Sequence, residues 1–100
     1  MVRLTESQIQ TLINATHQCF GDDASIWLFG SRVDDSKRGG DIDLYIETDQ
    51  KLGLVAAKLE MRSQIWPEFG DQKIDILLRS RSNELNPMHR VAKDTGIELK

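Results

Sequence analysis

One stretch of the sequence decides the fold: Gly40-Asp41-Ile42-Asp43-Leu44-Tyr45-Ile46. Apolar and polar side chains alternate from residue 41 onward, which predicts a β-strand with one apolar face. Asp41, Asp43 and Tyr45 share the other face of that strand. Aspartate is disfavoured in strands, and two aspartates on one face repel each other, so we expect a bound cation to offset the repulsion. Mg²⁺ suits this position because it prefers hard oxygen ligands and is commonly held by one or two carboxylates together with substrate phosphates.

Two further strands are predicted around this one. Residues 25–29 are apolar on both faces, as is typical of a central strand. Residues 73–78 form the other strand, in which Asp75 points away from an apolar face. If strands 41–46 and 73–78 are neighbours, three carboxylates converge. Such a group can hold two metal ions about 3.5–4 Å apart, which stabilise the attacking and leaving oxygens of phosphoryl-type transfer.

Helical patterns alternate with these strands, which predicts an α/β (α+β) fold with a small mixed β-sheet and helices packed on it. The first helix is expected from Thr5 to about Phe20, because Thr5 and Gln8 have capping-box spacing. A second helix, 52–66, is expected to end before Pro67. Its apolar side chains share one face: Leu52, Val55, Ala56, Leu59 and Trp66. A short helix over 86–94 and a small terminal strand complete the prediction.

A turn at the end of strand 25–29 is suited to binding phosphate. Gly30 lets the backbone approach a phosphate closely. Ser31 offers a hydroxyl and a backbone N–H to an anion, and Arg32 adds a planar cationic group. Ser31 is alternatively a simple turn residue, and an exposed ion pair is as good an interpretation of Arg32.

Composition narrows the class of protein. The chain has 100 residues, of which 39% are hydrophobic and 29% are charged, so we expect one domain spanning residues 1–100. The net charge of −3 argues against an extended nucleic-acid surface. The sequence has neither an apolar run long enough to span a membrane nor the apolar core of a signal peptide at residues 1–10. A single cysteine, Cys19, forms no internal disulfide, so we expect a cytoplasmic protein.

Three motifs together resemble a known superfamily: Gly30-Ser31-Arg32, then Gly40-Asp41-Ile42-Asp43-Leu44, then Asp75 within residues 73–77. They are similar to the nucleotidyltransferases related to DNA polymerase beta, and especially to the minimal nucleotidyltransferase branch. The resemblance covers nearly the whole chain. It implies that Gly30 and Ser31 grip a nucleoside triphosphate and that Asp41 and Asp43 bind Mg²⁺. It makes Asp75 either a ligand of a second metal ion or the group that activates an acceptor hydroxyl.

The resemblance also implies a partner. Minimal members often pair with a small helical HEPN-type protein as antitoxin and toxin, and some of those antitoxins adenylylate a tyrosine of the toxin. We therefore expect transfer of a nucleotide, AMP from ATP, to a hydroxyl of a partner in a hetero-oligomer. The alternative is a binding module that neutralises its partner by occlusion. Transfer to an antibiotic ranks third, because related enzymes of that type carry an extra domain for the acceptor. Mg²⁺ is favoured over Mn²⁺ by analogy alone.

The remaining candidates have simpler interpretations. His17 and His89 are expected to be surface or helix-end residues rather than metal ligands, because neither has a partner at zinc-binding spacing. Trp27 and Trp66 are expected in the core, with a place in a partner interface as the alternative for one of them. Tyr45 either lines the nucleotide site or packs beneath it. The basic pairs Lys37-Arg38 and Arg79/Arg81 are expected on a solvated surface, and Cys19 is expected to be a small buried apolar group.

Overall fold

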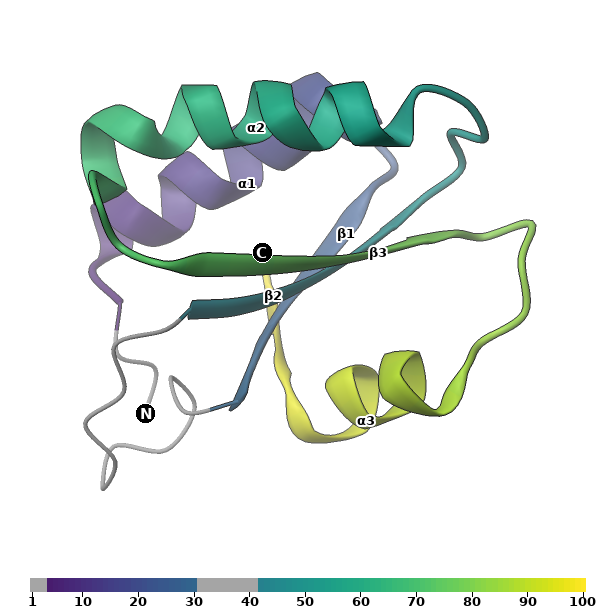
Figure 1. Cartoon of the computed structure of the whole chain (residues 1–100). Coiled ribbons are helices and arrows are strands. Elements are labelled where there is room, and N and C mark those ends of the chain that lie inside the picture. Colours follow the sequence, from purple (N-terminus) through teal and green to yellow (C-terminus); the bar gives the residue numbers. More distant parts are fainter. Residues whose placement is uncertain (1–3, 31–41) are drawn as a thin grey trace.

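The computed structural model describes residues 4–30 and 42–100, and these form a small mixed α/β domain. The elements follow one another as α1 (Glu6–Phe20), β1 (Ser25–Phe29), β2 (Ile42–Thr48), α2 (Leu54–Phe69), β3 (Ile74–Ser80), α3 (Pro87–Thr95) and β4 (Ile97–Leu99). The sheet has the order β3-β2-β1-β4. Strands β2 and β3 are parallel, and β1 is antiparallel to both β2 and β4. Helices α1 and α2 cover one face of the sheet, and α3 covers the other (Figure 1).

The core lies between the sheet and the α1/α2 layer. Alternation along β2 places Ile42, Leu44 and Ile46 in this core, each at most 1% exposed. Helix α1 begins at the predicted capping box, in which the Thr5 hydroxyl accepts from the Gln8 backbone N–H. The prediction that 25–29 is a central strand is confirmed by the strand order. The condition set for convergence of the carboxylates also holds, because β2 and β3 are neighbours.

Helix α2 differs from the prediction in three ways. It begins at Leu54, after Gly53, so Leu52 lies before the helix. It continues through Pro67 to Phe69, because burial of Phe69 and a bond from Gly70 N–H to the Trp66 carbonyl hold the last turn. The buried face is also a different one, made by Met61, Ile65 and Phe69.

The residues expected to be buried on α2 are exposed instead. Ala56 is exposed. Four large apolar side chains, here called the α2 stripe, are exposed as well: Leu52 (85%), Val55 (75%), Leu59 (62%) and Trp66 (57%). Periodicity could not choose between two apolar faces of one helix, and packing against α1 and the sheet chose the other face. The expectation that Trp66 is a core residue is therefore wrong.

Candidate active site

Asp43 and Asp75 lie side by side on neighbouring strands. They are directly opposite each other in the register of the parallel pair β2/β3. Neighbouring strands of a sheet lie about 5 Å apart. Both alternate with core residues, so both belong to the sheet face opposite α1 and α2. Asp43 is half-buried, and Asp75 is exposed. The two carboxylates therefore occupy one small region of one face, as the strand pattern predicts.

Gly30 adjoins this pair from the other side. Phe29, the last residue of β1, is the register partner of Asp43, so Gly30 follows directly beside the carboxylate. Gly30 has a φ of +79°, and a Cβ atom at this position would collide with Oδ2 of Asp43. The backbone conformation and the close approach both require glycine. From the sequence we expect this glycine to allow a close phosphate contact, whereas the atoms that the Gly30 backbone approaches are those of Asp43.

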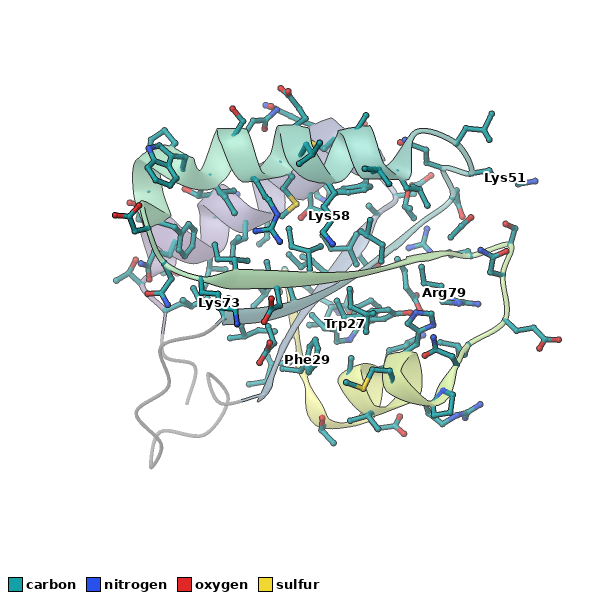
Figure 2. All side chains as sticks on the ribbon, in the orientation of Figure 1. Trp27, Phe29, Lys51, Lys58, Lys73 and Arg79 are labelled. Carbon is teal, nitrogen blue, oxygen red and sulfur yellow. The ribbon has the colours of Figure 1, made fainter. Side chains whose placement is uncertain are left out.

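A pocket of about 410 Å³ opens at the two carboxylates. Asp43 and Asp75 line it together with Phe29, Ile76, Leu77, Lys58, Arg62 and Met88. Its size lies within the range of small-molecule sites. Figure 2 shows Lys58 extending from α2 toward β3. Sequence reasoning missed Lys58 and Arg62, whose three- or four-residue spacing from apolar residues of α2 was the only available signal.

A smaller cavity of about 260 Å³ lies toward the C-terminal end of α2. Arg62 lines both cavities, so the two adjoin the same residue. Trp66, Phe69 and Ile74 make this second cavity largely apolar, and Asp71 contributes a carboxylate to its lining.

Three of the predicted site residues, Ser31, Arg32 and Asp41, lie outside the described residues. Within 4–30 and 42–100, no group of three or more His, Cys, Asp or Glu side chains is placed to hold a metal ion. The two described carboxylates nevertheless fit Mg²⁺ chemically, because they bring hard oxygen donors from adjacent register positions to one pocket. Substrate phosphates and waters commonly complete such a site.

A buried polar cluster lies on the same sheet face, beneath α3. Glu47 is 5% exposed, and its Oε2 accepts a hydrogen bond of 2.6 Å from the Tyr45 hydroxyl. The same oxygen lies 3.0 Å from a guanidinium nitrogen of Arg79 and 3.1 Å from Nζ of Lys93, and Oε1 lies 3.9 Å from Nε of Arg81. The expectation of a solvated surface is wrong for Arg79, whose side chain is 13% exposed. A buried carboxylate is tolerated here because three cations surround it.

The aromatic side chains beneath α3 settle the position of Tyr45. Tyr45 is fully buried, and its ring centroid lies 5.3 Å from those of both Trp27 and His89. Tyr45 therefore packs under α3 and does not reach the pocket. His89 is a helix-end residue, one of the two positions expected for it, because its Nδ1 accepts from the Asn86 backbone N–H to cap α3. It is buried and not on the surface, because it stacks on Tyr45. His17 lies in the last turn of α1, as expected.

The ionisation of this cluster follows its packing. Burial raises the pKa of Tyr45, and the hydrogen bond to Glu47 raises it further. Burial opposes ionisation of Glu47, but hydrogen bonds from Tyr45 and Lys93 and the charges of Lys93 and Arg79 outweigh it and lower the Glu47 pKa. Burial and the nearby charge of Arg79 lower the pKa of His89. The cluster therefore holds α3 on the sheet through a charged Glu47 and a neutral His89.

Comparison of the sequence with models of protein families gives no match, and comparison with curated proteins gives none either. Among the described residues, no helix has the length and apolar character needed to cross a membrane. The arrangement of the site is therefore the basis for any statement about function.

Proposed function

We propose that this chain is a nucleotidyltransferase of the polymerase-beta-like fold that transfers AMP from ATP to a hydroxyl of a partner protein. The observation that carries the proposal is the juxtaposition of Asp43 and Asp75 at one pocket, with Gly30 packed against Asp43. Two carboxylates in register on parallel strands, beside a glycine that no other residue can replace without strain, are unusual in a merely structural sheet face.

In the proposed reaction, the acceptor oxygen forms a bond to the α-phosphorus while the bond from that phosphorus to the β-phosphate oxygen breaks. Pyrophosphate leaves with the bonding electron pair. Mg²⁺, when bound, supplies charge neutralisation at the α-phosphate and lowers the pKa of the acceptor hydroxyl. Asp43, with Asp41, would hold the ion that neutralises the triphosphate, and Gly30 and Ser31 would hold the terminal phosphates. Asp75 lies on the acceptor side, where it binds a second ion or accepts the hydroxyl proton.

The proposed acceptor is a HEPN-type helical toxin, so the chain acts as an antitoxin. Two features support a macromolecular acceptor. Asp75, Ile76 and Leu77 of the edge strand β3 line the pocket, and the α2 stripe leaves apolar surface uncovered next to Lys58 and Arg62, which also line it. The same exposed surface favours the second candidate, a non-catalytic antitoxin that neutralises its partner by occlusion.

The decisive experiment incubates the chain with MgATP and the HEPN-type protein, followed by intact-mass spectrometry of that protein. We expect an added mass of one AMP. Asp43→Asn should abolish the mass addition, and Asp94→Asn, which changes an exposed aspartate of α3, should preserve it. Absence of transfer with all four triphosphates would exclude the enzymatic proposal, and neutralisation that survives Asp43→Asn would favour occlusion.

A further inference from the structure

The direction from which an acceptor reaches the site follows from in-line transfer, and this inference rests on the proposed function. Displacement at the α-phosphorus requires the attacking and leaving oxygens to lie on opposite sides of it. Gly30, where the terminal phosphates are held, lies on the β1 side of Asp43, whereas Asp75 lies on the β3 side. The acceptor therefore enters over β3, which is an edge strand of the sheet described here.

Two cationic side chains line the pocket on the β3 side, where the acceptor is expected to enter. Lys58 and Arg62, one helical turn apart on α2, line the pocket together with Asp75. Neither makes an ion pair with any residue in 4–30 or 42–100. Both are half-buried, so their positions are partly determined by packing. This entrance therefore favours an acceptor that brings carboxylates.

The α2 stripe lies next to these cations: Val55, Leu59 and Trp66 are on the same helix, and Leu52 lies just before it. Lys58 follows Val55 by three positions, and Arg62 follows Leu59 by three and precedes Trp66 by four. Residues at this spacing are neighbours on a helix surface. Apolar anchors bordered by charged groups are the arrangement of protein interfaces, in which a few large side chains supply most of the binding energy.

We propose that the α2 stripe, together with Lys58 and Arg62, is the docking surface for the acceptor protein. The segment that docks covers the stripe with apolar side chains and pairs carboxylates with Lys58 and Arg62, which places its hydroxyl over Asp75. A nucleic acid is disfavoured as occupant because the stripe is apolar and the net charge of the chain is −3. A second copy is disfavoured because a two-fold pairing of this face would gather Lys58 and Arg62 of both copies, and like charges oppose association.

The test compares Leu59→Asp, at a side chain that is 62% exposed, with Val91→Asp, at a side chain of α3 that is 50% exposed. The probe is the purified HEPN-type protein of the proposed function. Leu59→Asp should weaken binding of the probe at least about tenfold, as loss of a central anchor does. It should raise the KM for the probe while leaving kcat and the affinity for MgATP unchanged. Val91→Asp should leave probe binding, the KM for the probe, kcat and the affinity for MgATP unchanged. Lys58→Gln should weaken probe binding and reduce its dependence on salt concentration.

Each other outcome counts against a specific claim. Equal probe affinity for wild type and Leu59→Asp, or no binding of the probe by wild type, overturns the docking proposal. A wild-type dimer in sedimentation velocity that Leu59→Asp dissociates overturns it in favour of a second copy. Failure of the wild type to bind MgATP counts against the proposed function alone, because Asp43 and Gly30, and not the α2 stripe, carry that claim. A midpoint of thermal unfolding for Leu59→Asp equal to that of the wild type shows that the variant is folded.

Discussion

The backbone of Gly30 lies against the carboxylate of Asp43, where β1 ends beside β2. A side chain at position 30 would meet Oδ2 and Cγ of Asp43, so the position of the aspartate depends on the absence of a side chain on the neighbouring strand. Gly30 therefore links the strand-end turn to the proposed metal ligand through direct contact.

Gly30→Ala should displace the Asp43 carboxylate and destabilise the fold. We expect the free energy of unfolding to fall by roughly 2–4 kcal/mol, from the left-handed backbone together with the collision. Gly53→Ala is the matched control, because Gly53 has a left-handed backbone, with a φ of +71° and a ψ of +23°, and a Cβ there would meet only a side-chain nitrogen of Gln50 at 3.7 Å. It should cost only about 1–2 kcal/mol. Urea denaturation of both variants measures the difference, and equal losses would show that the contact with Asp43 is unimportant.

Mg²⁺ should stabilise the folded chain through the paired carboxylates. A ligand that binds only the folded state adds RT ln(1 + [L]/Kd), about 1.4 kcal/mol at ten times Kd. We expect the midpoint of thermal unfolding to rise with Mg²⁺ concentration. Asp43→Asn and Asp75→Asn should each remove most of this rise, and Asp94→Asn should retain it. If Mg²⁺ raises the unfolding midpoint of Asp75→Asn as much as that of the wild type, Asp75 is not a metal ligand.

Glu47→Gln should be strongly destabilising because it leaves Arg79 and Lys93 close together without the carboxylate that both contact. We expect a loss of about 3–5 kcal/mol in the free energy of unfolding. Tyr45→Phe removes only the hydroxyl that donates to Glu47, so it should lose about 1.5–3 kcal/mol. Chemical denaturation checks both values. If Glu47→Gln lowers the free energy of unfolding by less than Tyr45→Phe does, the ion pairs of Glu47 contribute little to stability.

Stability should fall as the pH is lowered below the ordinary His pKa of 6.5. The pKa of His89 is lower in the folded state, so the unfolded chain binds more protons in the window between that value and 6.5, and stability decreases on acidification. The depressed pKa of Glu47 adds a further loss below its ordinary value of 4.5. Arg79 and Glu47 are the charged groups that act on His89, with opposite effects on its pKa.

His89→Gln isolates the histidine contribution, because glutamine at this position can still accept from the Asn86 backbone N–H in a capping box. Denaturant midpoints between pH 7 and pH 5 should change less in His89→Gln than in wild type. An identical pH dependence in the two proteins would assign the effect to other groups.

Periodicity along short segments predicted most of the elements. The alternation along 42–46, the capping box at Thr5 and the apolar run 25–29 each depend on residues close together in the chain, and each is present in the structure. Helix α2 shows where this approach fails. Its sequence carries two apolar faces, and Pro67 lies so near the end that tertiary contacts keep the last turn helical.

The sequence by itself determined the strands and the alternation that places Asp43 opposite the core, because these depend on local backbone geometry and side-chain direction. That Gly30 lies against Asp43 was decided by the pairing of β1 with β2. Only the tertiary structure decided that Asp75 pairs with Asp43, that Lys58 and Arg62 border their pocket, that the α2 stripe remains uncovered, and that Glu47 is buried among cations. Those relationships join residues far apart in the chain, and the packing of whole elements, which no local pattern encodes, brings them together.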